Sequence, residues 1–184
     1  IQIHLIGANR VAAAVLPGMI ERQRGDLIFV GSDVALRQRP HMGAYGAAKA
    51  ALVAMVNNLQ MELEGTGVRA SIVHPGPTKT GMGWSLPADL LGPALEDWAK
   101  WGQARHDYFM RASDLARAIT FVAQTPRGHY IATLELQPDA PLATPTERQP
   151  LQAHDHAPHR AIHATRHASS ATQATVIHAT TATP

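Results

Sequence analysis

The sequence predicts an α/β fold, with a parallel β-sheet flanked by helices. Apolar residues recur at helical spacing over about residues 1–22 and 43–64, whereas the compact apolar runs at 26–31 and 68–74 are typical of buried strands. Helix and strand therefore alternate, which favours parallel strands joined by helical crossovers. With 184 residues, of which 45% are apolar, the chain is long enough for one domain with a sizeable core.

The first helix, at about residues 1–22, has an amphipathic pattern from its start. Ile3, Val11 and Val15 recur at helical spacing, and Pro17 is tolerated as a kink near the end. Because no capping residue precedes this pattern, we expect a fragment or a processed chain whose first elements are missing. No signal peptide is visible, and no run approaches the roughly 18 apolar residues of a membrane span.

The next elements follow from strong local signals. Residues 26–31 form a strand that is followed by an arginine-rich polar loop at 33–42. The helix at 43–64 is stopped by Gly65-Thr66-Gly67, and the strand at 68–74 ends at Pro75-Gly76-Pro77.

The segment 78–110 is less regular, with several glycines and prolines among aromatic residues. It is either a lid or substrate loop or a surface excursion of short helices. Its aromatic side chains either line a substrate pocket or simply pack (Trp84, Trp98, Trp101 and Tyr108). Beyond it, Ser113-Asp114 is expected to cap a helix that runs to about Ala123, and 130–136 is the last expected strand.

Composition excludes several classes of function. Cysteine is absent, so the chain has no disulfide framework, thiol nucleophile or zinc–thiolate site, which fits the cytoplasm. The net charge is +2 and the arginines are scattered, so neither nucleic acid nor a membrane is an expected partner.

From about Pro141 the composition changes to alanine, threonine, histidine and proline. We expect residues 141–184 to be a disordered low-complexity tail, because few bulky apolar side chains offset the entropy of ordering. His159, His163 and His167 recur every four residues, so a helix would place them on one face. We expect only adventitious metal binding there and assign no metal site.

One constellation carries chemistry. Ser32 closes the strand at 26–31, and Tyr45 and Lys49 follow, with Tyr45 thirteen residues after the serine. Four residues make about one helical turn, so Tyr45 and Lys49 share a face, and an ammonium there favours the phenolate. A serine hydroxyl nearby could hold a substrate oxygen against the phenol, although Ser32 alone could equally satisfy backbone groups in a turn. The pattern predicts a proton-transfer site.

With these residues and the Pro75-Gly76 strand end, the chain resembles the short-chain dehydrogenase/reductase family over about residues 1–140. The resemblance implies the second half of a Rossmann-type domain, whose first βαβ half would be missing. Tyr45 would then be the general acid or base, Lys49 would assist it and bind the nicotinamide ribose, and Ser32 would polarise the reacting oxygen.

The resemblance also implies NAD or NADP as cofactor, bound by Tyr45, Lys49 and the strand end. The backbone amides of Pro75-Gly76 would meet the nicotinamide carboxamide, with Thr78 and Thr80 nearby; Thr80 could instead cap a helix. The family's usual asparagine in the first helix is replaced by His4, to which we give a proton-relay role; the alternative is a partly buried helix histidine. No G-x-G-x-x-G turn occurs to cradle a pyrophosphate.

The implied activity is hydride transfer between a nicotinamide and a carbonyl or alcohol substrate, in a homo-oligomer (a dimer or tetramer). The alternative is a truncated, inactive relative that lacks the phosphate site and acts at most in subunit association. A histidine-tail metal-binding protein is a third option.

Overall fold

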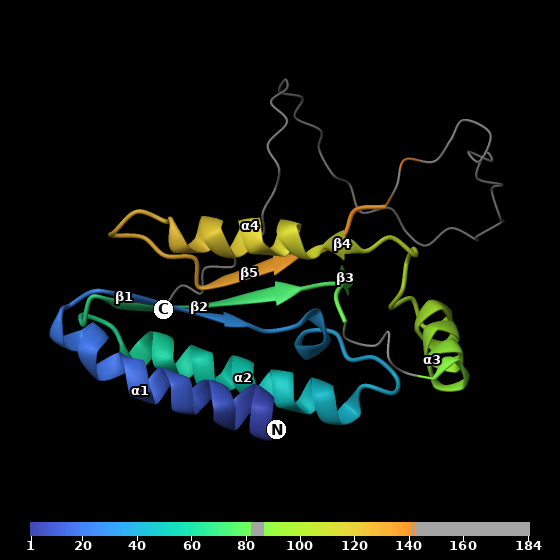
Figure 1. Cartoon of the computed structure of the whole chain (residues 1–184), viewed down its shortest axis with the longest axis horizontal. Coiled ribbons are helices and arrows are strands. Elements are labelled where there is room, and N and C mark those ends of the chain that lie inside the picture. The colour runs from blue at the N-terminus through green and yellow to red at the C-terminus, as the bar shows by residue number, and fades with distance from the viewer. Residues whose placement is uncertain (82–86, 141, 143–184) are drawn as a thin grey trace, which may run out of the picture. The chain divides into compact units, whose positions relative to one another are not determined.

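The computed structural model describes residues 1–81, 87–140 and 142. Its larger sheet contains the strands β1 (Gly25–Val30), β2 (Val68–Pro75) and β5 (Thr133–Leu136) in the order β1-β2-β5 (Figure 1). Both pairings are parallel, with Gly25 opposite Val68 and Ile72 opposite Thr133. The predicted α/β class with a parallel sheet is confirmed.

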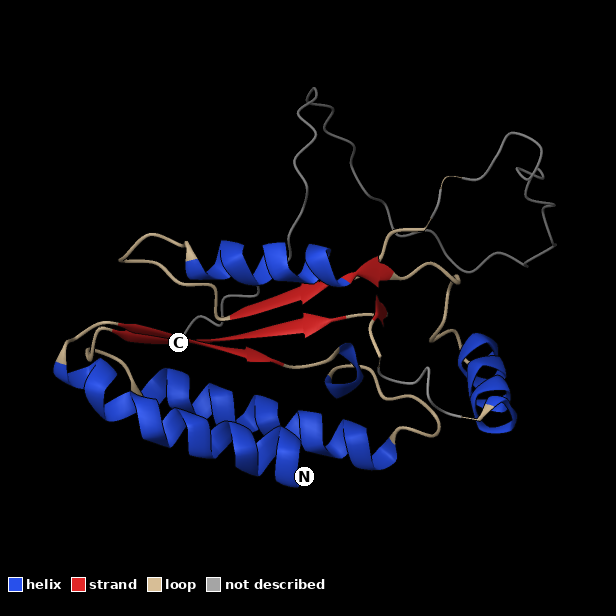
Figure 2. Ribbon diagram, viewed as in Figure 1, coloured by secondary structure: helices blue, strands red, loops and turns tan. Residues whose placement is uncertain are grey.

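Helices cover both faces of this sheet (Figure 2). One face carries α1 (Ala8–Glu21), which continues a π-helical segment at Gln2–Gly7, together with α2 (Gly43–Glu62). The other face carries α4 (Ala112–Ala123). Because α2 joins β1 to β2 and α4 lies between β2 and β5 in the chain, the predicted crossovers are confirmed.

The core has two layers, one on each side of the sheet. The first packs α1 and α2 against β1 and β2 and contains Ala12, Leu27, Leu52, Val56, Leu63, Val68, Ala70 and Ile72. The second packs α4 against the sheet around Val73, Val122 and Leu134. Ile72 and Val73 are adjacent in β2 and belong to opposite layers, as the alternation of side chains along a strand requires.

The segment 78–110 contains a helix, which agrees with the interpretation of this segment as an excursion of short helices. It contains α3 (Ala88–Lys100) and two short parallel strands, β3 (Thr78–Lys79) and β4 (Met110–Arg111). Gly92 and Pro93, which read as helix breakers, lie inside α3. Trp98 and Asp97 of α3 bond to the loop after β1, and these tertiary bonds help to hold the helix in spite of such local propensities.

Two predicted boundaries were wrong. The carboxylate of Asp114 accepts a hydrogen bond from the backbone N–H of Arg111, at 3.0 Å, so α4 begins at Ala112 and Asp114 lies in its first turn. Asp114 therefore satisfies the helix start from inside the helix. The last strand begins at Thr133, three residues later than expected.

One helical stretch among the described residues, Gln2–Glu21, is long and apolar enough to cross a membrane by length and composition, with a mean hydropathy of 1.4. This stretch is not an unbroken apolar run, since His4, Asn9 and Arg10 interrupt it, so it does not contradict the expectation drawn from the sequence. A core helix of a soluble protein, or a signal sequence near the N-terminus, meets the same criterion. The tail predicted for 141–184, with His159, His163 and His167, lies outside the described residues apart from Leu142.

Candidate functional site

Ser32 lies where β1 ends. The backbone N–H of the preceding Gly31 donates to the Val73 carbonyl at 2.7 Å, which fixes this end of β1 against β2. The Ser32 hydroxyl oxygen accepts from the Val34 N–H at 3.4 Å and lies 3.5 Å from an Asp33 carboxylate oxygen. The Ser32 hydroxyl oxygen thus satisfies a backbone group in the turn. Its proton makes only a long contact, with Asp33, and could be donated to a substrate oxygen.

Tyr45 and Lys49 share one face of the first turns of α2. The Lys49 ammonium lies 5.8 Å from the centre of the Tyr45 ring. It donates to the Val30 carbonyl at 2.8 Å, two residues before Ser32, and so ties α2 to the end of β1. Lys49 is buried, and loss of solvation lowers its pKa. A lysine ammonium has three N–H groups, so further donors are available to a ligand.

The structure brings His4 to the same cluster. Its ring meets the Tyr45 ring edge to face, with centres 5.3 Å apart. Burial, followed by the charge of Lys49, lowers the His4 pKa below its ordinary value. The imidazole is therefore neutral at neutral pH and can both accept and donate a proton.

Ser32 joins this cluster through packing. A Cβ at Gly46, beside Tyr45, would lie 3.1 Å from the Val34 side chain, so α2 and the turn after Ser32 approach closely. The carboxyl end of β1 and the start of α2 therefore lie together, as expected for a site at the carboxyl edge of a parallel sheet.

His74 was not singled out from the sequence. It is 0% exposed, and its Nδ1 lies 3.0 Å from the Ser32 carbonyl oxygen. Loss of solvation lowers its pKa, although the Ser32 carbonyl and the Asp33 charge act in the opposite sense. A neutral His74 thus donates from Nδ1 to the backbone of Ser32. A histidine within an apolar strand, just before the Pro-Gly strand end, was the available signal.

The strand end after β2 differs from its expected role. The Gly76 amide donates to the Leu136 carbonyl at 2.8 Å, and Pro75 has no amide hydrogen. The expectation that Pro75-Gly76 amides face a carboxamide is therefore corrected, because the only amide hydrogen of this pair is used in the sheet. The Thr78 hydroxyl donates to the Gly76 carbonyl at 2.9 Å. Thr80 follows β3, where its role toward a cofactor stays a prediction.

Side-chain bonds hold α3 near this edge of the sheet. The Trp98 indole donates to the Pro40 carbonyl at 2.8 Å, and His41 meets Asp97 at 2.8 Å. Beneath them, Arg39 pairs with the buried Asp33, which also accepts from Gln137 at 3.3 Å. Asp33 adjoins Ser32, so the loop after β1, α3 and the residues after β5 meet beside the serine.

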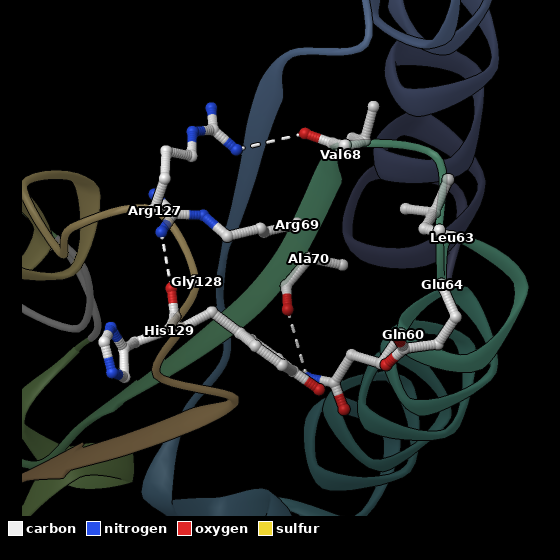
Figure 3. A pocket seen from close by; sticks show the side chains of 12 residues that line it. Gln60, Leu63, Glu64, Val68, Arg69, Ala70, Arg127, Gly128 and His129 are labelled. Atoms are coloured by element: carbon white, nitrogen blue, oxygen red, sulfur yellow. Dashed lines mark hydrogen bonds between the residues drawn. The ribbon is translucent and has the colours of Figure 1, made fainter.

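A second hollow lies at the amino end of β2, away from this cluster (Figure 3). Its arginines are used in structural bonds: Arg69 bonds Asp26 at 2.6 Å and three backbone carbonyls beyond α4, and Arg127 bonds the Gly67 carbonyl and Asp26. These hydrogen bonds and ion pairs hold the loop after α4 against β1 and β2. The candidate site is therefore the opposite, carboxyl edge.

The residues at the carboxyl edge fit the reactive end of a nicotinamide cofactor. Lys49 keeps donors for a ribose, and Tyr45 is only half buried beside it. The 184 residues contain no glycine-rich phosphate turn, so a pyrophosphate has no comparable partner in this sequence.

Comparison with known proteins gives consistent matches. A family model described as short chain dehydrogenase matches residues 1–91. The vibriobactin-specific 2,3-dihydro-2,3-dihydroxybenzoate dehydrogenase of Vibrio cholerae is 32% identical over 131 residues, which are 69% of this chain and 50% of that protein. The 2,3-dihydro-2,3-dihydroxybenzoate dehydrogenase of Bacillus subtilis is 32% identical over 133 residues, with the same coverage.

The fold has solved counterparts. A closed form of serine dehydrogenase complexed with NADP+ has a TM-score of 0.57 and 28% identity, covering 75% of this chain and 55% of that one. The chain spans about half the length of the relatives it matches. The matched range 1–91 does not by itself make the chain the second half of a domain, and that assignment stays a prediction.

Proposed function

The chain belongs to the short-chain dehydrogenase family, and on that premise we propose that it supplies the proton-transfer site of an NAD(P)-dependent oxidoreductase. The observation that carries this proposal is the cluster in which Tyr45 meets both Lys49 and His4. Tyr45 thus has a buried ammonium and a neutral imidazole as neighbours, so a positive charge and a group that can pass a proton both lie beside its ring.

In the proposed reaction, the Ser32 hydroxyl donates a hydrogen bond to the carbonyl oxygen of the substrate. Tyr45 gives its phenolic proton to that oxygen as the carbonyl becomes an alcohol, and takes a proton back in the oxidation direction. His4 returns a proton to the phenolate. A nicotinamide bound at this edge would supply or accept the hydride of this reaction.

One N–H of Lys49 donates to the Val30 carbonyl, and the other two would hold the nicotinamide ribose. Thr78 and Thr80 lie on the chain segment where we propose a contact with the carboxamide. We further propose that residues 1–140 form the second half of a longer Rossmann-type domain.

The substrate is proposed to be a small molecule with a secondary alcohol or ketone. The names of the two relatives specify a dihydroxylated benzoate derivative as their substrate, which supports an alcohol on a small ring as the first compound to assay. A homo-oligomer is also proposed. It is supported by apolar side chains exposed on the paired helices α1 and α2, among them Val11 and Met61, which are 64% and 76% exposed.

The test is Tyr45→Phe, assayed in two contexts: this chain, and an extended chain in which the N-terminal half of the Bacillus subtilis relative precedes Ile1. Removing only the hydroxyl should lower carbonyl reduction by about 10²–10⁴-fold in the extended chain, the usual contribution of a positioned acid. Oxidation of the reduced nicotinamide, followed by absorbance, measures this.

Tyr130→Phe is the matched control, because Tyr130 is 41% exposed and lies at the opposite edge of the sheet. Its turnover should equal that of the parent. Equal turnover of Tyr45→Phe and Tyr130→Phe would remove Tyr45 from the mechanism.

A further inference from the structure

A cavity of about 370 Å³ adjoins the network that leads to Ser32. It lies between α3, the loop after α3 and the residues after β5, and its lining contains none of Ser32, Tyr45 or Lys49. Its apolar lining includes two aromatic rings (Pro77, Leu95, Trp98, Ala99 and Phe109). This volume lies at the low end of small-molecule sites, so it suits one ring-sized group.

Two guanidinium groups line the cavity, and one of them is already paired with a buried carboxylate behind it. Arg39 and Arg105 contribute positive charges, against the single carboxylate of Asp107. Arg39 is the most enclosed of these, since its side chain is 10% exposed and its guanidinium carbon lies 5.5 Å from the centre of the Trp98 ring. Its partner Asp33 is not part of the lining. A planar guanidinium stacked on an indole is well suited to a carboxylate attached to a ring.

Two of the lining residues each have a buried nitrogen atom without a hydrogen-bond partner among the described residues: Nε of Arg39 and Nδ1 of His106. They come from different segments, the loop after β1 and the loop after α3. Nε of Arg39 is always a donor, and Nδ1 of His106 is a donor in one of the two neutral tautomers. A buried polar atom without a partner is costly, so these atoms call for a group that the described residues do not supply. A ligand carboxylate has two oxygens and can accept from both segments.

We propose that this cavity binds a small ring-bearing carboxylate, with the ring between Trp98 and Phe109 and the carboxylate on Arg39 and His106. The ion pair of Arg39 with Asp33 places this ligand beside the residue that adjoins Ser32. That this ligand is the substrate rests on the proposed function. That the cavity binds it does not, because binding requires no turnover.

The experiment titrates benzoate and its neutral counterpart benzamide against the 184-residue chain by ligand-observed NMR. Benzoate should bind roughly tenfold more tightly than benzamide, the ratio expected from one charge-assisted contact. Arg39→Lys keeps a positive charge for Asp33 but removes Nε and the planar fork, so it should clearly lower this ratio.

A cavity-filling variant tests the location. Ala99→Phe fills the cavity from α3 and should abolish binding of both probes, whereas Ala116→Phe, at an exposed position of α4, should leave binding unchanged. Circular dichroism checks that each variant folds.

Three results would overturn the inference: equal affinity for benzoate and benzamide, binding that survives Ala99→Phe, or an unchanged preference in Arg39→Lys. Failure of the proposed oxidoreductase activity is a separate result. Benzoate binding that persists in Tyr45→Phe, in a chain without turnover, would leave the cavity assignment intact.

Discussion

At the scale of single residues, the position of Ser32 depends on His74 as well as on β1. The His74 ring occupies the space beside Gly31: a Cβ on that glycine would lie 2.7 Å from Nδ1. The same nitrogen donates to the Ser32 carbonyl. Because Gly31 has no side chain, the buried His74 ring fits beside it and donates to the backbone of Ser32.

His74 should also make stability depend on pH. Its folded-state pKa is depressed, so below about pH 6.5 the unfolded chain takes up a proton that the folded chain refuses. The free energy of unfolding should therefore fall as the pH drops below 6.5, until the folded-state pKa is reached. The slope from this group is at most about 1.4 kcal/mol per pH unit.

Urea unfolding at pH 7.5, 6.5 and 5.5 measures this slope. His74→Asn keeps a donor for Ser32 but cannot titrate, so its slope should be smaller than that of the parent. His129→Asn changes an exposed histidine and should keep the parental slope. Identical slopes in all three proteins would contradict the assignment.

The local sequence pattern was sufficient to place Ser32, Tyr45 and Lys49 in the fold. The end of a strand and the spacing of a helix locate them without reference to distant residues. His74, Asp33 and Arg39 could not be assigned in this way. Their roles depend on contacts made across the fold, such as the bond from β2 to Ser32 and the ion pair beneath α3.

At the scale of elements, the turn between α2 and β2 contains two glycines with different requirements. Gly65 and Gly67 both adopt positive φ, of 74° and 77°. A Cβ at Gly65 would meet nothing within 4 Å, whereas one at Gly67 would lie 2.1 Å from the Gln23 carbonyl oxygen. The sequence predicted that a helix stops here, but it did not distinguish the two glycines. The difference comes from Gln23, which follows α1 and is distant from Gly67 in the sequence.

The two alanine variants should therefore differ in stability. Gly65→Ala should lose about 1 kcal/mol of unfolding free energy, the cost of a left-handed conformation for a residue with a side chain. Gly67→Ala should lose clearly more, because a backbone collision with Gln23 adds to the same cost. Urea unfolding of the two variants measures the difference; equal losses would show that Gln23 moves away freely.

The element that the sequence left undecided is α3. Its glycine and proline kept both a loop and short helices open, and the structure has a helix that two side-chain bonds connect to the loop after β1. Propensity is a weak guide when tertiary contacts decide.

At the scale of the whole molecule, β1 forms an outer edge of the sheet in the described part of the chain. A groove of about 360 Å³ runs along it, lined by residues of β1, the first helical turns and Lys49. Ile3 and Val30 contribute to it and are 83% and 42% exposed. An unpaired strand edge beside exposed apolar side chains is a place where another strand can pair.

If a further parallel strand with its glycine-rich turn pairs there, cofactor affinity should change sharply. The described residues of the 184-residue chain offer contacts to the nicotinamide end, whereas the extended chain adds backbone amides and a helix N-terminus for the pyrophosphate. Calorimetric titration with NAD+ and NADP+ should give at least about tenfold tighter binding to the extended chain, equivalent to about 1.4 kcal/mol.

Two controls separate the possible causes. Tyr45→Phe in the extended chain should keep most of the cofactor affinity, since the phosphate contacts are intact while proton transfer is lost. A dye that fluoresces on apolar surfaces should bind less to the extended chain than to the 184-residue chain, because the added strand covers Ile3 and Val30. Equal cofactor affinity of the two chains, with equal dye binding, would mean that β1 is a true edge and that residues 1–140 are not half of a larger domain.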